Sequence, residues 1–289
     1  MNYHGQRIME RVFEILFFIC ALASVAAVLL ICVFLFAGGI PAMGEVGFFD
    51  FILGRKWAPL DVPPSFGILP MILGSIYITL GAVIVGVPIG ILTAVFMARC
   101  CPRPLYRVLR PAVELLAGIP SVVYGFFGLV VLVPLVRDKF GEDGMNILTA
   151  SLLLGMMILP TIITISESAL RAVPEHYYEG ALALGATHER SVFAVVLPAA
   201  ASGIMAAVVL GIGRAIGETM AVIMVAGNQP RMPKGILKGI RTLTSNIVTE
   251  MSYAADLHRE VLIATGVILF VFILLINLGF AALKRRMNK

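Results

Sequence analysis

The sequence predicts an all-α polytopic membrane protein that crosses the bilayer six times, and two observations support this prediction. The chain has 289 residues, of which 60% are hydrophobic and only 13% are charged, and its mean hydropathy is +0.98. A soluble domain carries about 25% charged residues. The apolar residues also lie in blocks of roughly 20 or more, the length that a helix needs to cross the hydrocarbon core.

The apolar blocks divide the chain into an anchor, a core and a short tail. They cover residues 13–37, 68–98, 111–136, 147–166, 199–226 and 261–283. The first block is too long for a cleaved signal peptide and lacks a small-x-small cleavage site, so we expect a retained anchor helix. This gives an anchor with an outer loop over 1–67, a core of five spans over 68–283, and a basic tail over 284–289.

An even number of spans leaves both termini on one side of the membrane, and the positive charges indicate which side. The loop RCCPRPLYRVLRP holds four arginines and no acidic residue. Under the positive-inside rule this loop and both termini are cytoplasmic, although the basic residues within 231–241 would then lie outside. The net charge of +5 is therefore a topology signal and does not indicate a nucleic-acid partner. The cysteines and histidines lack metal-binding spacing, so we expect free thiols and no metal.

Two long outer segments join the spans on the other side. The segment 38–67 is rich in glycine, proline and aromatic residues. In the segment 227–260, four apolar residues recur at helical spacing: Ile236, Ile240, Leu243 and Ile247. An amphipathic helix lying on the outer surface has this pattern, and so does a docking surface for an external partner. The pattern alone does not choose between them.

Prolines interrupt the third and fourth predicted spans. Pro120 lies in AGIPSVVYGFFG and Pro160 lies in MMILPTIIT. A proline in a membrane helix frees backbone groups that neighbouring helices, water or a lined cavity must satisfy. The nearby hydroxyl groups of Ser121, Tyr124 and Thr164 favour a polar pathway, and ordinary helix packing is the alternative.

Small residues follow one face of the fifth predicted span, at every fourth position: Gly203, Ala207, Gly211, Ala215 and Thr219. Such a ridge lets another helix approach closely. Gly213 and Gly217 form a second small strip. We therefore expect this helix to pack against protein and not against lipid.

The same span carries Arg214 and Glu218 in the stretch GIGRAIGETMAV. An arginine at the centre of a span costs about 2.5–3.5 kcal/mol on insertion scales, and a glutamate one turn away offsets part of this cost. One interpretation is a self-neutralising structural pair. The other is a functional site, because a guanidinium suits phosphate, sulfate or carboxylate. A functional pair would line an anion path or, alternatively, relay protons.

The inner segment between the fourth and fifth spans predicts a helical hairpin. Pro174 opens a helix that continues to Leu184, Gly185 permits a turn, and a second helix follows over 187–196. Two spans can be joined without such a hairpin. We therefore expect it to fit into a partner.

Within this hairpin, the string EGALALGATHERSVFAVVLP resembles the EAA motif of ABC importer permeases. Five residues fall in register with that motif: Glu179, Ala181, Gly185, Leu197 and Pro198. Gly180 and Val195 depart from it, and both changes are conservative in size. The stretches AGIPSVVYGFFG, ILPTIITISESALRAVP and GRAIGETMAVIMVAGN resemble the phosphate-specific importer permeases. The ending TMAVIMVAGN is similar to their C-type subunit, and the likeness runs over residues 70–283.

The resemblance implies a type I ABC importer permease fold, with Glu179, Gly180, Ala181 and Gly185 on the helix that couples to the ATPase. It implies a phosphate path that includes Arg214 and Glu218, which we extend to Thr219, Ser121 and Tyr124.

The implied partners are a homologous A-type permease, which the small-residue ridge of the fifth span would suit, two ATP-binding subunits and an extracytoplasmic phosphate-binding protein. The chain has no G-x-x-x-x-G-K-[ST] loop, so we expect no cofactor in this chain and no enzyme activity of its own, with ATP and Mg on the partner ATPase.

The resemblance also implies a bacterial or archaeal plasma membrane protein in contact with lipid. Three alternatives remain: a permease for another oxyanion such as sulfate, molybdate or phosphonate, a proton-coupled secondary transporter that uses Glu218, and a membrane enzyme. The sequence shows no internal repeat for the second and no converging catalytic residues for the third.

Overall fold

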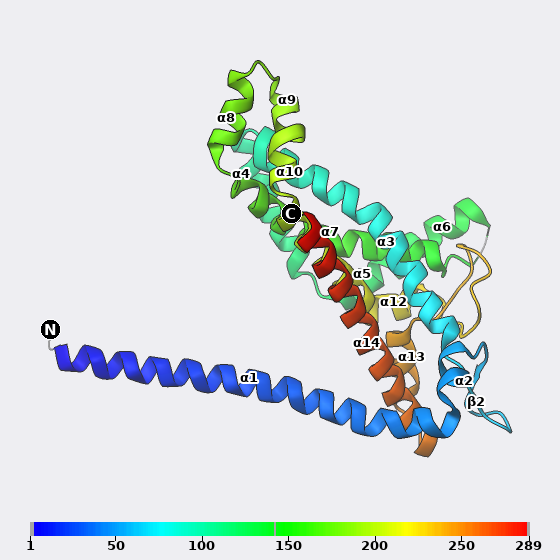
Figure 1. Cartoon of the computed structure of the whole chain (residues 1–289). Helices are drawn as coiled ribbons and strands as arrows, with labels where there is room; N and C mark the ends of the chain where they lie inside the picture. The colour runs from blue at the N-terminus through cyan, green and yellow to red at the C-terminus, as the bar shows by residue number, and fades with distance from the viewer. Residues whose placement is uncertain (1–2, 142, 288–289) are drawn as a thin grey trace.

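The computed structural model describes residues 3–141 and 143–287, and these form a helical protein with one long helix that projects from the body (Figure 1). Five helices are long and apolar enough to cross a membrane, and a bent helix pair raises the number to six. The first span lies in α1 (Tyr3–Val46), which extends past the predicted end of the anchor helix. Only its last part packs on the body, where Gly39 lies against Ala264 of α14 (Asp256–Met287).

The centre of the fold is the pair of helices α3 (Leu69–Val95) and α7 (Ile147–Arg171). The helix α3 continues through a π-helical turn, η1 (Phe96–Cys100). We call this end of the molecule the inner end and the opposite end the outer end, after the topology that the sequence predicts. Glycines let the two helices pack closely: a Cβ added to Gly86 would lie 2.8 Å from the carbonyl oxygen of Gly155. The helix α7 begins directly after Asn146, whose side chain accepts a hydrogen bond from the amide of Thr149 and caps the helix.

The third span differs from the prediction of one helix over 111–136. The chain instead forms α4 (Arg103–Gly118), an amphipathic helix on the inner side, and then breaks at Ile119 and Pro120. The span itself starts at Ser121 and runs through α5 (Ser121–Phe127), η2 (Gly128–Leu132) and α6 (Val133–Phe140). Proline cannot donate a backbone hydrogen bond and forces the preceding residue out of the helical region. The apolar residues of 111–118 continue directly into the true span, so hydropathy alone did not show that the interruption predicted at Pro120 separates two helices.

The predicted continuous helix over 199–226 is also wrong. The hairpin helices α8 (Glu175–Ala183) and α9 (His188–Ser191) are followed by η3 (Val192–Val196) and α10 (Leu197–Ala199). The chain then bends by 69° into α11 (Ala201–Gly217). After an extended residue at Glu218, a further helix, α12 (Met220–Val225), completes the segment.

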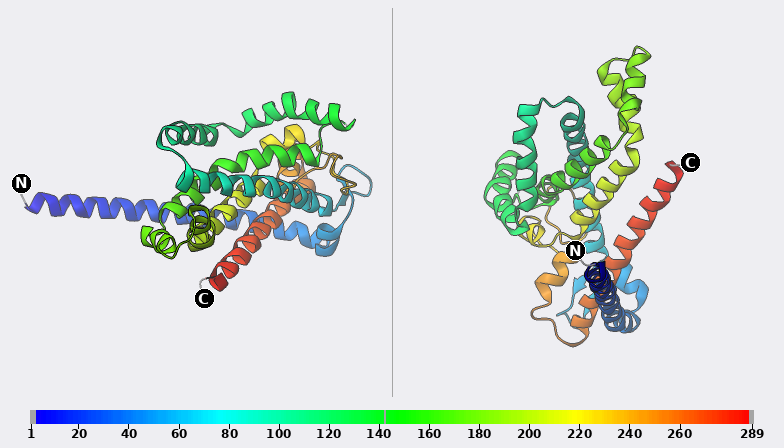
Figure 2. Two further views of the ribbon diagram at one scale, coloured as in Figure 1. Left: turned by 90° about the horizontal axis from the view of Figure 1, so that it is seen from above. Right: turned by 90° about the vertical axis from the view of Figure 1, so that its left-hand side faces the viewer.

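The outer segments fold into a compact cap at the end of the molecule opposite to the hairpin α8–α9 (Figures 1 and 2). This cap contains α2 (Phe48–Leu53), the two-stranded antiparallel sheet of β1 (Trp57–Ala58) and β2 (Ser65–Phe66), and α13 (Leu243–Glu250). The predicted surface helix through Ile236 and Ile247 is wrong, because the helix begins only after Thr242, which caps it. Its first residues are buried in the cap, so the start of α13 is part of the core.

The sixth span is longer than predicted, because α14 begins at Asp256 and continues to Met287. The first four residues of the predicted basic tail are therefore helical, and residues 288–289 lie outside the described part of the chain.

Candidate transport path and its polar networks

Arg214 lies in the last turn of α11, where its Nη1 donates a hydrogen bond to Thr161 Oγ1 of α7 at 3.2 Å. The side chain is half-buried, and its charge acts on the hydroxyl group of Tyr124 in α5. None of the ion pairs among the described residues includes Arg214. Arg214 therefore lies between helices without an ion-pair partner among the described residues.

Glu218 does not continue the helix that carries Arg214, and in the described part of the chain no ion pair joins the two residues, so the interpretation as a self-neutralising pair is not supported. The helix α11 ends at Gly217 and Glu218 adopts an extended conformation with φ −70° and ψ 132°. Its carboxylate accepts the amide hydrogen of Ala221 at 3.2 Å, and its carbonyl oxygen accepts the hydroxyl of Thr244 at 3.0 Å. Glu218 thus caps α12 and ties this break to the outer helix α13. Thr219 lies in the same break and donates its hydroxyl to the carbonyl oxygen of Gly217 at 3.3 Å.

Ser121 and Tyr124 lie on α5, directly after the break in the third span. Ser121 is half-buried at the helix start, and Tyr124 is only 7% exposed. The hydroxyl of Tyr124 donates to the carbonyl oxygen of Leu116 at 2.9 Å, so it joins the two sides of the break. The helix α5 packs on α12, where a Cβ added to Gly125 would lie 3.0 Å from the Cα of Ala221. The segments that carry Tyr124 and Glu218 are therefore close neighbours.

The small-residue ridge packs on α7 of the same chain, and its expected role in receiving a partner permease is wrong. A Cβ added to Gly203 would lie 2.4 Å from the Cβ of Ala169, and one added to Gly211 would lie 3.1 Å from Ile162. Ala207 and Ala215 of the same ridge are also buried. The second strip faces open space within the described residues, because a Cβ added to Gly213 or Gly217 would meet nothing within 4 Å.

The hairpin α8–α9 has the predicted helix, turn and helix, and it projects from the inner end of the fold (Figure 1). Gly185 forms the turn with φ +85°, a conformation that other residues adopt only with strain. No residue of α8 is buried. Glu179 and Gly180 are exposed and Ala181 is half-buried, so these residues of the EAA-like motif are accessible to a partner.

Polar contacts fasten the base of the hairpin to the inner end of α3. Arg99 of η1 donates to Glu175 Oε2 at 2.7 Å and to the carbonyl oxygen of Leu170 at 3.0 Å. Tyr178 of α8 and His188 of α9 share a hydrogen bond of 2.7 Å between the tyrosine hydroxyl and Nδ1. Sequence reasoning missed these contacts because their partners, such as Arg99 and Glu175, are far apart in the chain.

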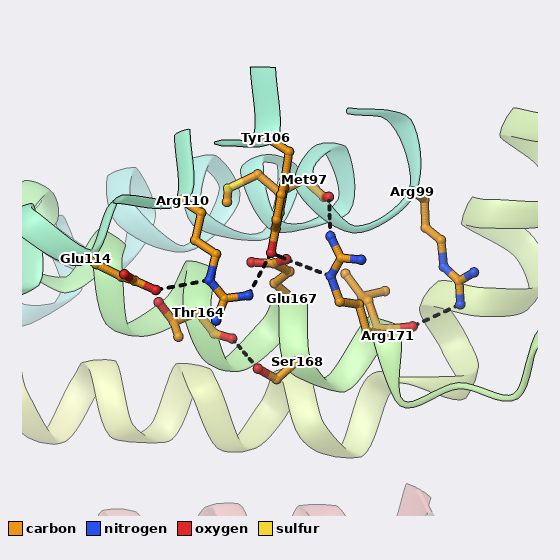
Figure 3. Close-up of polar contacts among 10 residues, drawn as sticks. Met97, Arg99, Tyr106, Arg110, Glu114, Thr164, Glu167, Ser168 and Arg171 are labelled. Carbon is orange, nitrogen blue, oxygen red and sulfur yellow. Dashed lines mark hydrogen bonds and ion pairs between the residues drawn. The ribbon is translucent and has the colours of Figure 1, made fainter. Parts of the chain in front are cut away.

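A second network lies between α4 and α7 at the inner end (Figure 3). The carboxylate of Glu167, which is 6% exposed, accepts the Tyr106 hydroxyl at 2.7 Å and Arg171 Nε at 2.7 Å. The Tyr106 hydroxyl in turn accepts Arg110 Nη1 at 2.8 Å, and Arg110 Nε donates to Glu114 Oε1 at 3.0 Å. The hydrogen bonds to Tyr106 and Glu114 raise the pKa of Arg110 above its ordinary value. Of these contacts only the pair of Arg110 and Glu114 has the four-residue spacing of neighbours on one helical face.

A third network stabilises the outer cap around Glu250, which is 4% exposed. Its Oε2 accepts Trp57 Nε1 at 2.9 Å and pairs with His258 Nε2 at 2.9 Å, and its Oε1 accepts Arg241 Nη1. The contacts join β1, α13 and α14. Burial, and then the charge of Glu250, raise the pKa of Tyr253 at the edge of this network.

The chain forms a bundle of apolar helices with an exposed hairpin at one end and a folded cap at the other, and comparisons with known proteins identify its family. Residues 86–289 match the family described as "Binding-protein-dependent transport system inner membrane component", and the chain belongs to this family. The members that resemble it are ABC permease subunits, which are transport components and not enzymes.

Among its relatives, the "Probable ABC transporter permease protein YqgH" of Bacillus subtilis is 40% identical in an alignment of 267 positions, which covers 89% of this chain and 86% of the relative. The "Phosphate transport system permease protein PstC" of Mesorhizobium japonicum is 38% identical, over 85% of this chain and 81% of the relative.

Two solved structures share the fold. A bacterial alginate ABC transporter, solved in complex with an alginate pentasaccharide-bound periplasmic protein, superposes with a TM-score of 0.71 and 14% identity over 98% of both chains. The inward-facing methionine ABC transporter MetNI gives a TM-score of 0.63 and 21% identity, over 77% of this chain and 96% of that chain. At these identities the likeness supports the type I ABC importer permease fold alone.

Proposed function

We propose that this chain is a permease subunit of an ATP-driven importer for inorganic phosphate, and that Arg214 lies on the translocation path. The observation that carries the proposal is the uncompensated guanidinium of Arg214, held between α11 and α7 by a single threonine hydroxyl. A half-buried cation inside an apolar span without an ion-pair partner is costly, which favours a site that an anion completes in passing. The relatives named as phosphate transport permeases support phosphate as that anion.

Arg214 would bind the anion weakly and transiently. Its guanidinium presents several N–H donors, of which the contact with Thr161 uses one. The remaining donors suit the oxygens of phosphate. Ser121, Tyr124 and Thr219 lie on neighbouring segments and complete the proposed path. A homologous A-type permease would supply the opposite wall, because one subunit of this fold lines only part of such a path.

Glu218 would shape the path without exchanging protons along it. Its carboxylate is engaged by the backbone amide of Ala221 and holds the break between α11 and α12. This arrangement gives no support to the alternative of a proton-coupled secondary transporter. The break itself allows α12 to move relative to α11, as alternating access in a broken span requires.

The energy would come from ATP and Mg bound by two partner ATP-binding subunits. The exposed hairpin with Glu179, Gly180, Ala181 and Gly185 would fit into a groove of such a subunit and follow its closure. Arg99 and Glu175 then transmit this movement to α3. An extracytoplasmic phosphate-binding protein would deliver the ion to the outer cap. We place the chain in a bacterial or archaeal plasma membrane, with the hairpin and both termini in the cytoplasm.

The test is uptake of radiolabelled phosphate into proteoliposomes that contain this chain with its partner permease, ATP-binding subunits and binding protein. We expect ATP-dependent uptake of phosphate that unlabelled phosphate inhibits and that sulfate or molybdate does not. If the transporter takes up labelled sulfate, molybdate or phosphonate and does not take up phosphate, the chain is still an importer permease but phosphate is not its substrate. Uptake that persists without ATP and follows a proton gradient would contradict the whole proposal.

A further inference from the structure

Two arginines from different helices meet beside a small hollow at the inner end of the fold. Arg110 of α4 and Arg171 of α7 are about half exposed, at 54% and 46% of their side chains. Both contact Tyr106: Arg110 donates to its hydroxyl, and the guanidinium of Arg171 lies 4.8 Å above its ring. Figure 3 shows the two guanidinium groups on either side of the Tyr106 hydroxyl.

The hollow offers hydrogen-bond donors that its own residues do not use. It is lined by Met97, Arg110, Val113, Glu114, Thr164, Glu167, Ser168 and Arg171. In the described part of the chain, Arg110 uses Nε and Nη1, and Arg171 uses Nε and Nη2. Each guanidinium therefore has a further nitrogen with free N–H groups. These groups and the nearby hydroxyl of Thr164 suit the oxygens of a phosphate group, whereas Ser168 donates its hydroxyl to the carbonyl oxygen of Thr164 at 2.9 Å.

The charge around the hollow is positive. Helical spacing places Arg103, Arg107, Arg110 and Glu114 along one face of α4, and the first two are exposed. With Arg171 and Glu167 on α7, four arginines stand against two glutamates and leave two positive charges. Glu167 is buried and committed to Tyr106 and Arg171, whereas Glu114 is 58% exposed and can release Arg110 to a stronger ligand.

The face of α7 that holds Arg214 leads to this hollow. Thr161, which accepts the hydrogen bond from Arg214, is followed by Thr164 and Ser168 at intervals of three and four residues. Such intervals keep all three side chains on one face of a helix. At 1.5 Å per residue, Ser168 lies about 10 Å from Thr161 toward the inner end. An anion that leaves Arg214 along this face therefore reaches Arg110 and Arg171 next.

We propose that Arg110 and Arg171, with the hydroxyl of Thr164, form a second phosphate-group site at the inner end of the path. The phosphate group has two possible sources, the orthophosphate that is transported and the headgroup of an anionic lipid. If the ligand is transported orthophosphate, the inference rests on the proposed function; if it is a lipid headgroup, the inference is independent of that function. The glutamates hold the two arginines in place when the site is empty and keep binding weak, so that the ion is released.

The experiment measures binding of orthophosphate to the assembled transporter by ³¹P NMR line broadening, in neutral detergent and without the binding protein. All samples carry Arg214→Gln, so that the path cation does not contribute. We expect saturable broadening that weakens at least fivefold in Arg110→Gln and strengthens severalfold in Glu114→Gln, because the latter removes a competing carboxylate. Arg137→Gln removes the same charge at an exposed residue of α6 and serves as the control.

The paired variants keep the test independent of folding. A misfolded protein does not bind phosphate more tightly, so the gain in Glu114→Gln is a result that a merely structural role for these side chains does not give. No saturable broadening in the Arg214→Gln protein, or equal binding in Arg110→Gln and Glu114→Gln, would overturn the site.

Two further arms identify the source and separate the two proposals. The first arm repeats the measurement in nanodiscs of phosphatidylglycerol and in nanodiscs of phosphatidylcholine. If the saturable broadening of orthophosphate is lost only in phosphatidylglycerol, the site binds a lipid headgroup. If the broadening is the same in both lipids, the site binds orthophosphate. Phosphate uptake by the otherwise unaltered transporter tests the proposed function alone. If binding that depends on Arg110 is retained but phosphate is not taken up, phosphate is not the transported ion and the proposed function is contradicted. If phosphate is taken up but no binding depends on Arg110, the inner site is contradicted.

Discussion

Replacement of Glu250 by glutamine tests the buried network of the outer cap. The carboxylate has two accepting oxygens, and each already has a donor: Oε1 accepts Arg241, and Oε2 accepts Trp57 and pairs with His258. Glutamine offers one oxygen and one amino group. Whichever way its amide turns, the amino group faces a donor and one hydrogen bond is lost.

The expected loss of stability follows from these contacts. An unsatisfied buried group costs about 1–3 kcal/mol, and breaking a buried ion pair costs about 3–5 kcal/mol. Arg241 is 14% exposed and keeps hydrogen bonds to Asn228 and Asn246, which softens the second cost. We therefore expect the free energy of unfolding to fall by about 3 kcal/mol, which raises the unfolding equilibrium constant roughly a hundredfold.

The sequence provides a direct reporter, because Trp57 is the only tryptophan of the chain and contacts Glu250 itself. Unfolding of the purified full chain in detergent is followed by the fluorescence of Trp57 as denaturant is added. Glu45→Gln makes the same chemical change at an exposed outer position and is the control. If Glu250→Gln unfolds at the same denaturant concentration as Glu45→Gln, the network contributes nothing and this reasoning is wrong.

Three further substitutions probe helix packing and the hairpin. Gly203→Leu overpacks the contact of α11 with α7 and is expected to lower the free energy of unfolding by about 1–3 kcal/mol. Gly213→Leu adds the same side chain where nothing lies within 4 Å and is expected to be neutral in the isolated chain. Thermal unfolding of the two variants compares these effects. Gly185→Ala places a Cβ at φ +85° and is expected to cost about 1 kcal/mol in the same assay, and an unchanged midpoint would contradict the strained turn. Glu175→Gln removes the ion pair with Arg99 and is expected to lower uptake per ATP hydrolysed while ATP hydrolysis persists; an unchanged ratio would exclude this contact from coupling.

Much of the fold could be predicted because the bilayer imposes simple requirements on sequence. Long apolar blocks predicted α1, α3, α7 and α14, and the structure confirms all four as candidate spans. The hairpin was predicted as well, because Pro174 and Gly185 mark its start and its turn and the local rules for helix ends decide its shape.

The breaks in the third and fifth spans could not be placed from hydropathy. Near Ile119 the apolar character continues although the helix does not, because the change lies in the backbone and not in the polarity of the side chains. At Glu218 the helix ends because the carboxylate caps the following helix, which competes with a pairing to Arg214. The spacing of four residues gave no sign of which contact would form.

The networks around Glu167 and Glu250 were beyond sequence reasoning for a different reason. Tyr106 and Glu167 are 61 residues apart, and Trp57 and Glu250 are 193 residues apart. Only the packing of α4 on α7 and of β1 on α13 brings them together. The sequence did indicate that Arg214 is unusual, because an arginine at the centre of an apolar span is costly.

The most direct test of the central claim is phosphate uptake by transporters that carry Arg214→Gln, Arg214→Lys or the control Arg137→Gln in the proteoliposome assay. A charge-assisted hydrogen bond contributes about 1.5–3 kcal/mol, so loss of the guanidinium is expected to slow uptake at least tenfold. Lysine, which keeps the charge without the fork, is expected to retain part of the rate, and Arg137→Gln to retain all of it. Uptake by an assembled Arg214→Gln transporter at the same rate as the control would contradict the account, because Arg214 would then be a structural residue outside the path.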